Sequence, residues 1–224
     1  MLSQDNIIRI CQISASFNPR VYDQLFRFIN TGEKDYLLKY KKFADRYNSL
    51  LALSLIKRLT NKKLNVQLSL LHTELGQPYL TGHQEHISIS HCENTIVVAM
   101  STNKVGIDVE KNLSTLGYEF ELFLADEEYE LLNNSKNKVD FITTLWTLKE
   151  AYLKLIGRGF FIDPTNISFN KIKERWFLKD DFCSFFSRDL PNGMKLSIAS
   201  EVEKEINFEK VTESELIEWL NNSI

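Results

Sequence analysis

The sequence predicts an α+β protein of two similar-sized halves, each a small antiparallel sheet packed with helices. Its expected elements run in the order strand, helices, strands and then helices, strands, helix. Such grouped runs are typical of the α+β class, whereas strict alternation of strand and helix would indicate a parallel sheet. The length of 224 residues suits one large or two small domains, and a 43% hydrophobic composition supports a real core.

The first half opens with an expected strand over residues 6–16, followed by a helix near 22–30. A longer helix is predicted over 45–60, where six leucine and isoleucine residues indicate a buried position.

Three strands are expected in the middle of the chain, at 87–90, 95–101 and 105–110. Short turn-forming connections separate them, so they are predicted to form an antiparallel meander. A second block of helices begins after them, which places the join between the halves near residue 103 and divides the chain into 1–102 and 103–224.

The second half is expected to begin with helical segments near 118–124 and 126–133. The strongest helical pattern covers 139–156 and ends at a glycine, as helices often do. Short β-like runs follow within 165–210, and a last amphipathic helix is predicted over 213–220.

Charge and cysteine content limit the functional classes. The net charge of −3 argues against a general nucleic-acid binder, which would usually be basic overall. Cys11, Cys92 and Cys183 are far apart and odd in number, so a reducing compartment such as the cytoplasm is expected. No signal-peptide pattern is seen, and no apolar run approaches membrane-spanning length.

Two short acidic segments form the candidate site. Asp108 and Glu110 lie in the expected strand Val105–Lys111, where alternation puts them on one face, roughly 6–7 Å apart along the chain. Glu150 lies on the strongest helix, with Lys154 one turn later. Three carboxylates suit a hard cation such as Mg²⁺, and a lysine beside them suits phosphate.

Each segment also has an ordinary structural interpretation. Asp108 and Glu110 could simply line a solvated strand face, and Glu150 with Lys154 could be a surface ion pair. Gly106 favours the functional interpretation, because it leaves room for a ligand to approach the backbone. The position of Glu150 near the edge of the apolar helix face favours it as well, since partial burial promotes a shared cation or a raised pKa.

All four histidines fall between residues 72 and 91. A zinc site that also uses Cys92 is an alternative, but no helical H-x-x-x-H or Cys-x-x-Cys spacing supports it. His91 and the Ser90 hydroxyl, at the end of a Ser-x-Ser strand, could hold a phosphate, and a structural role for His91 stays open.

Three ordered motifs resemble those of the 4′-phosphopantetheinyl transferases: S-I-S-H at 88–91, G-I-D-V-E at 106–110 and W-x-x-K-E-A-x-x-K at 146–154. The chain length and the near-central second motif are similar to the surfactin-type branch, which implies two halves related by a pseudo-two-fold axis. The strong match covers roughly residues 75–160, and residues 45–52 fit more loosely.

The resemblance implies transfer of 4′-phosphopantetheine from coenzyme A to a serine of an acyl or peptidyl carrier protein, with release of adenosine 3′,5′-bisphosphate. It implies that Asp108, Glu110 and Glu150 bind Mg²⁺, with Mn²⁺ as an alternative. Glu150 also matches the residue suggested as the base for the serine. A monomer would suffice, and neither nucleic acid nor a membrane is expected as a partner.

Further contacts follow from the same resemblance. Lys154 matches the lysine on the diphosphate, and so a catalytic residue, and Lys149 matches another coenzyme A contact. Ser90 and His91 match the pair that holds the 3′-phosphate region. Glu127 matches an acidic residue sometimes placed near the metal.

Two positions depart from the family pattern. Asn48 stands where the family usually has an arginine, and Gln77 where a lysine is common. Arg46, or a lysine between residues 39 and 42, is a candidate to supply a missing charge. Two rival functions therefore stay open: a non-catalytic homologue that binds coenzyme A, and a different metal-dependent phosphoryl or nucleotidyl transferase that prefers ATP or another nucleotide.

Overall fold

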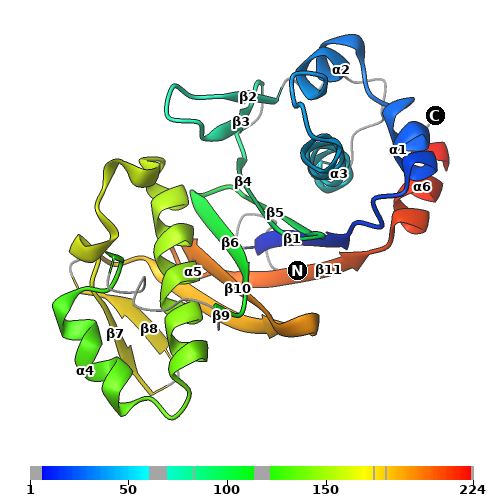
Figure 1. The fold of residues 1–224 in the computed structure, drawn as a ribbon. Coiled ribbons are helices and arrows are strands. Elements are labelled where there is room, and N and C mark those ends of the chain that lie inside the picture. The colour runs from blue at the N-terminus through cyan, green and yellow to red at the C-terminus, as the bar shows by residue number, and fades with distance from the viewer. Residues whose placement is uncertain are drawn as a thin grey trace.

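The computed structural model describes residues 7–60, 70–82, 84–113, 122–173, 175–179 and 181–222. It confirms the α+β class: small, mainly antiparallel sheets are packed with helices (Figure 1). None of the described helices is long and apolar enough to cross a membrane.

The helices and strands follow the predicted order. The elements up to residue 101 are β1 (Ile7–Ser14), α1 (Pro19–Phe26), α2 (Thr31–Leu37), α3 (Phe43–Leu59), β2 (Leu70–His72), β3 (Pro78–Leu80), β4 (His86–Cys92) and β5 (Thr95–Ser101). Those that follow are β6 (Val105–Lys111), α4 (Asp126–Asn134), α5 (Lys138–Ile156), β7 (Phe169–Ile172), β8 (Arg175–Leu178), β9 (Ser184–Leu190), β10 (Met194–Ser200), β11 (Glu205–Val211) and α6 (Glu213–Asn222).

Two larger sheets organise the molecule. One has the strand order β11-β1-β5-β4 and the other the order β6-β10-β9, while β2-β3 and β7-β8 are separate hairpins. Among the described strands, only β1 and β11 pair in parallel. As a result β11 completes the first sheet, and α6 packs beside α1 (Figure 1). The division at residues 102 and 103 stays a prediction, and this topology adds the late elements β11 and α6 to the first half.

The expected three-stranded meander is wrong. β4 and β5 form the predicted hairpin, but β6 pairs with β10 in the other sheet. The connection is short enough for pairing, yet both faces of β5 are covered and β1 already occupies its second edge. Local turn signals could not reveal this choice, because it depends on strands about a hundred residues away.

The helices differ from the prediction near the N-terminus and in the middle of the chain. α1 begins earlier than expected, since Asn18 caps it and Pro19 stands at its first turn. α2 was not predicted, although Asn30 and Glu33 form a reciprocal capping box there. Most of the helix expected near 118–124 lies outside the described residues.

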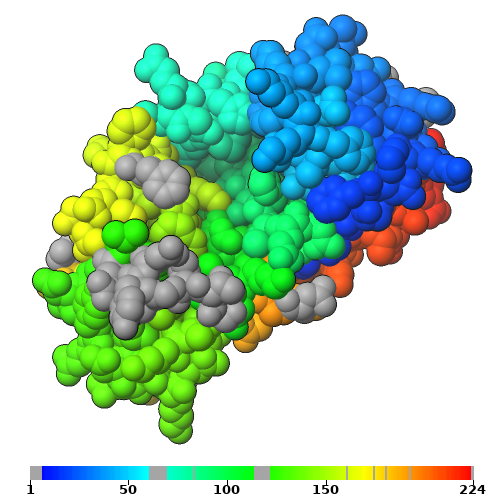
Figure 2. Space-filling view, in the orientation of Figure 1, coloured from blue at the N-terminus to red at the C-terminus, as the bar shows by residue number. Residues whose placement is uncertain are grey.

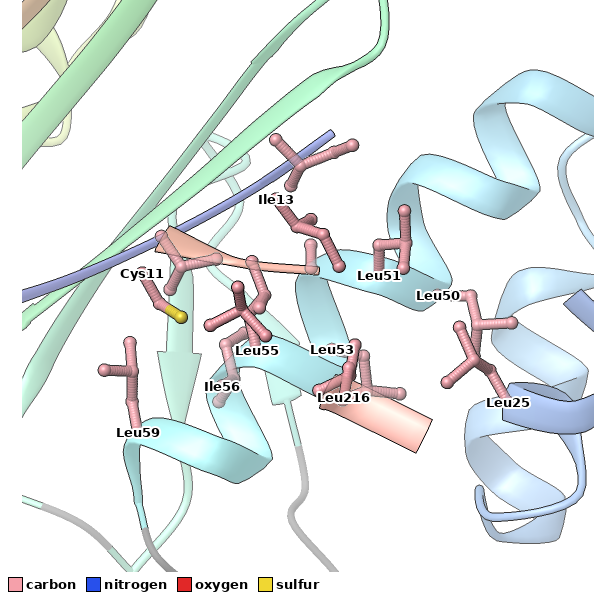
Figure 3. Packing of buried hydrophobic residues seen from close by; sticks show 14 of the residues in the cluster. Cys11, Ile13, Leu25, Leu50, Leu51, Leu53, Leu55, Ile56, Leu59 and Leu216 are labelled. Carbon is pink, nitrogen blue, oxygen red and sulfur yellow. The ribbon is translucent and has the colours of Figure 1, made fainter. Parts of the chain in front are cut away.

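α3 forms the centre of the first hydrophobic core. Its leucine and isoleucine side chains are almost completely buried, as the sequence predicted. They pack against Cys11 and Ile13 of β1, Leu25 of α1 and Leu216 of α6 (Figure 3). This core therefore joins elements from both ends of the chain.

A second core lies between the two larger sheets. Ile8, Ile10 and Val97 of the first sheet meet Val105, Ile107 and Val109 of β6 within one buried cluster. The predicted apolar face of β6 is thus confirmed, and its other face carries Gly106, Asp108 and Glu110. Because the two sheets share this cluster, the halves form one packed body.

α5 lies very close to β6 at Gly106. A Cβ built on this glycine would fall 1.8 Å from the carbonyl oxygen of Ala151 and 2.6 Å from the amide nitrogen of Leu155. No side chain fits in that space. The prediction that Gly106 leaves room for a ligand therefore needs correction, since the backbone of α5 fills the space.

A buried ion pair fixes the outer side of α5. The Lys149 ammonium donates to Glu128 of α4 at 2.6 Å and to the carbonyl oxygens of Phe123 at 2.5 Å and Pro164 at 3.0 Å. Both side chains are completely buried. Glu128 also accepts from the amide nitrogens of Ala125 and Phe169. The pair therefore ties α5 to α4 and to the start of β7.

Substitution of Gly106 tests the close helix packing. We expect Gly106→Ala to lower the free energy of unfolding by about 2–3 kcal/mol, since α5 must move to accept the methyl group. Gly32→Ala is the control, because its nearest neighbour would be Asn30 Oδ1 at an ordinary 3.5 Å. Urea unfolding measures both variants, and equal stabilities would contradict the packing described.

Removal of the Lys149 charge tests the ion pair. We expect Lys149→Met to cost about 3–5 kcal/mol of unfolding free energy, because Glu128 would keep a buried, unpaired charge. Lys179→Met is the matched control, since its pair with Glu127 is exposed and is worth about 1 kcal/mol or less. Chemical denaturation of both variants separates these costs, and a similar small loss in each would count against the buried pair.

Candidate functional site

The candidate site lies where the polar face of β6 meets the face of α5 that carries Glu150 and Lys154. Asp108 is buried, and its Oδ1 atom accepts from Lys154 Nζ at 2.7 Å and from Ser90 Oγ at 2.8 Å. Its Oδ2 atom is also buried but has no hydrogen-bond partner among the described residues. One oxygen of this carboxylate is therefore buried and unpaired.

Glu150 has a strongly perturbed pKa. Burial raises the pKa of this carboxyl to about 7, the charges of Asp108 and Glu110 add to the rise, and Lys154 opposes it. Its Oε1 atom is buried without a partner in the described part of the chain. A carboxylate in this state favours an added positive charge, because a cation would satisfy the oxygen and offset the repulsion.

Glu110 completes the group of three carboxylates. Burial and the charge of Asp108 raise its pKa, while hydrogen bonds with Cys92 and Trp146 lower it. The Trp146 indole can only donate, so it holds this carboxylate from the helix side. Trp146 begins the third sequence motif, but the motif alone did not predict this contact.

The three carboxylates have the right chemistry to bind a cation, but they do not lie close enough together to enclose one. Within the described residues, no group of three or more His, Cys, Asp or Glu side chains is close enough to enclose a metal ion. Lys154 lies against Asp108 instead. Mg²⁺ needs only one or two carboxylates when phosphate oxygens and waters fill its remaining positions. The unpaired oxygens of Asp108 and Glu150 fit such a partial set.

The two lysines of the third motif have different environments. Lys154 is partly exposed and contacts both Asp108 and Ser90. Lys149 points away from the carboxylates, and its ammonium is fully used by Glu128 and two carbonyl oxygens. The predicted contact of Lys149 with coenzyme A disagrees with this geometry, because the helical spacing of five residues places the two lysines on different sides of α5.

Ser90 and His91 also separate. Ser90 is buried next to Asp108, whereas His91 follows it on β4 and is exposed. Alternation along the strand sends neighbouring side chains to opposite faces, so the two residues do not form one pair here. Arg46 lies elsewhere again, on α3, where its charge acts on Tyr22 of α1.

Asn48 and Gln77, the two departures from the family pattern, lie in different environments. Asn48 is buried, and its Oδ1 atom has no partner among the described residues. Gln77 donates from Nε2 to the carbonyl oxygen of Lys154 at 3.2 Å. Its Oε1 atom also fills the space beside Gly157, which ends α5 with a left-handed φ of 67°. Gln77 thus connects the β2–β3 hairpin to the end of α5.

The resemblance suggested that Glu127 lies near the metal, but in the structure its carboxylate makes a surface ion pair. Glu127 is exposed and pairs with Lys179 at 2.7 Å. Its neighbour Glu128 is the buried residue, and it serves the ion pair with Lys149. Two adjacent glutamates at the start of a helix look alike in the sequence, so only tertiary packing distinguishes them.

A small cavity opens beside Gln77 and Lys154. It has a volume of about 160 Å³ and lies between the β2–β3 hairpin, β4 and the end of α5. Gln77, Ile89 and Leu153 contribute to its wall, and Lys154 stands at its edge. Figure 2 shows the surface hollowed between the N-terminal segments and the end of α5. A ligand with an apolar arm and a charged end would match this lining.

Comparison with known proteins agrees with the motifs. A family model described as the 4′-phosphopantetheinyl transferase superfamily matches residues 104–199. The 4′-phosphopantetheinyl transferase gsp of Aneurinibacillus migulanus is 27% identical over 190 residues, which cover 80% of this chain and 79% of that protein. The 4′-phosphopantetheinyl transferase Sfp of Bacillus subtilis is 24% identical, with 61% and 64% covered.

Two further similarities cover shorter regions. The 4′-phosphopantetheinyl transferase HetI of a Nostoc species is 38% identical over 79 residues, or 32% of each chain. The crystal structure of Thermotoga maritima holo-(acyl-carrier-protein) synthase matches with a TM-score of 0.39 and 23% identity, covering 46% of this chain and 64% of that one. The matched relatives and the family model together confirm the resemblance drawn from the motifs: this chain is similar to the 4′-phosphopantetheinyl transferases, and its match to the superfamily model spans residues 104–199.

Proposed function

We propose that this protein transfers the 4′-phosphopantetheine group of coenzyme A to a serine of an acyl or peptidyl carrier protein. The observation that carries this proposal is the grouping of Asp108, Glu110 and Glu150 around Lys154, which also lines a cavity. One oxygen of Asp108 and one of Glu150 have no hydrogen-bond partner among the described residues. Transfer between phosphates and alcohols requires charge neutralisation and alignment, and these groups are suited to both.

The chemistry divides among the named side chains. The serine oxygen attacks the phosphorus next to the pantetheine, the bond from that phosphorus to the bridging oxygen breaks, and adenosine 3′,5′-bisphosphate leaves with the bridging oxygen. Asp108, Glu110 and Glu150 would hold Mg²⁺ or Mn²⁺, which supplies positive charge to the diphosphate. Lys154 places a further point charge beside the same group.

Glu150 is suited to take the serine proton. In the metal-free protein, burial raises its pKa to about 7, which makes it a better proton acceptor than an ordinary glutamate. A cation bound beside it would lower that pKa. The position of Glu150 one turn before Lys154 keeps acceptor and positive charge on one face of α5. The proton and the diphosphate can therefore be handled from a single helix.

The proposal includes the setting of the reaction. A monomer would suffice, because Asp108, Glu110, Glu150 and Lys154 all belong to one chain. A reducing cytoplasm would keep the thiols of Cys11, Cys92 and Cys183 free. Neither nucleic acid nor a membrane is needed as a partner.

Mass spectrometry of an apo carrier protein tests the transfer. Incubation with this protein, coenzyme A and Mg²⁺ should add one phosphopantetheine group to the carrier serine. Several carrier proteins should be tried at high enzyme concentration, and absence of the mass shift in all of them would refute the proposal. Binding of coenzyme A without transfer would instead indicate a non-catalytic homologue, and preference for ATP would indicate a different transferase.

Substitution of Glu150 tests the assignment of the site. We expect Glu150→Gln to lower kcat by about 10²–10⁴-fold, the usual contribution of a positioned general base. Asp108→Ala should also abolish most turnover. Glu205→Gln is the control, since this glutamate is exposed on β11. Steady-state kinetics would reject the site if Glu150→Gln kept near-normal turnover.

The pH dependence of stability reports the Glu150 environment without any activity. The folded-state pKa of about 7 exceeds the ordinary value of 4.5, so the folded protein holds the proton more tightly between these values. The stabilising contribution of the protonated group is full below pH 4.5 and is lost as pH rises through about 7.

Because glutamine imitates the protonated form, we expect Glu150→Gln to raise the Tm of the metal-free protein above pH 7 more than it does near pH 4.5. Thermal unfolding with a chelator present measures the difference. A Tm difference that does not change with pH would contradict the raised pKa.

A further inference from the structure

The edges of the two sheets meet along β4 and β6. The two strands are connected by hydrogen bonds from the backbone of β6 to side chains of β4. Strand β4 belongs to the first sheet and β6 to the second. Alternate side chains of β4 accept from alternate amide groups of β6: Ser88 Oγ from Ile107 N at 3.0 Å, Ser90 Oγ from Val109 N at 3.3 Å and Cys92 Sγ from Lys111 N at 3.2 Å. This ladder holds the halves together beside the candidate site.

Ser90 does more than its neighbours in this ladder. Its hydroxyl also donates to Asp108 Oδ1 at 2.8 Å and accepts from Lys154 Nζ at 3.1 Å. A serine hydroxyl has one proton and two lone pairs, so these three contacts use its full capacity. Ser90 is also only 6% exposed. A phosphate could reach its oxygen only if one of these bonds were broken.

We propose that Ser90 is a positioning residue that holds Asp108 and Lys154 in place across the junction of the two halves, and that it does not bind a phosphate of coenzyme A. The catalytic part of this inference, an effect of Ser90 on turnover, rests on the proposed function. Its structural part, a coupling between Ser90 and Lys154, stands on the hydrogen bonds alone.

The arrangement explains how two charged groups from different elements keep a fixed relation. Asp108 lies on a strand and Lys154 on a helix, and a surface lysine with its flexible stem would sample many positions. The Ser90 oxygen contacts both groups at once, and the same oxygen also accepts from the backbone amide of Val109, next to Asp108. Without that oxygen, the ion pair keeps its attraction but loses the contact that fixes its direction.

Kinetics and binding distinguish positioning from phosphate binding. We expect Ser90→Ala to lower kcat about ten- to a hundredfold, while the Kd for coenzyme A from calorimetry stays within about threefold, since a 1 Å misplacement alone can cost 10²-fold. Ser88→Ala is the matched control, because it removes a similar bond to the β6 backbone without the contacts to Asp108 and Lys154, and it should cost much less kcat. Ser90→Cys, which nearly keeps the volume but is a weak hydrogen-bonding group, should fall close to Ser90→Ala.

The opposite pattern would overturn the proposal. A Kd for coenzyme A raised at least tenfold by Ser90→Ala, with kcat little changed, would identify Ser90 as a ligand contact. Equal kcat losses in Ser88→Ala and Ser90→Ala would also refute it, since the ladder alone would then explain the effect.

A double-mutant cycle tests the coupling without any turnover. The Tm losses of Ser90→Ala and Lys154→Met should sum to more than the loss of the double variant, because the two residues share one contact. The same cycle with Ser88→Ala should be additive. Additivity in the Ser90 cycle would sink this inference whether or not the wild type transfers, whereas an inactive wild type with a coupled Ser90 cycle would sink the proposed function alone.

Discussion

The close approach of α5 to β6 at Gly106 is the constraint on which the site depends. With the helix backbone against the strand backbone, Glu150 and Lys154 can reach the face that carries Asp108 and Glu110. Any side chain at residue 106 would separate the two elements. The buried pair of Lys149 and Glu128 acts on the other side of the same helix, so that α5 is held from both directions.

The site is consequently rich in negative charge where water is scarce. Three carboxylates share a partly buried space with the single ammonium of Lys154, and the raised pKa values of Glu110 and Glu150 are the result. Proteins usually accept such repulsion only where function requires it, because each buried charge must be offset. Under the proposed function, the imbalance would favour arrival of a cation together with an anionic diphosphate, since the two would bring charges that complement both the acids and the lysine.

Local patterns in the sequence were sufficient for most elements and for the strand and the helix that carry the candidate acids. Alternation in 105–110 and helical spacing around Glu150 placed the acids correctly, because these periodicities act over a few residues. The sheet partner of β6, the burial of Lys149 and the choice of Glu128 over Glu127 could not be predicted in this way. Each depends on which distant segment packs against the residue. Two adjacent glutamates, for example, do not indicate in the sequence which of them will be buried.

The parallel pairing of β1 with β11 has a consequence for how the chain is made. Ile7 lies opposite Glu205, so the whole stretch between these residues must leave the ribosome before β1 gains its second neighbour. At ~5–20 residues per second that interval is on the order of ten seconds or more. Throughout it, one edge of the first sheet and the space later filled by Leu216 are exposed, which is the condition under which nascent strands aggregate or recruit chaperones. The half that is first in sequence is therefore the last to be completed during synthesis.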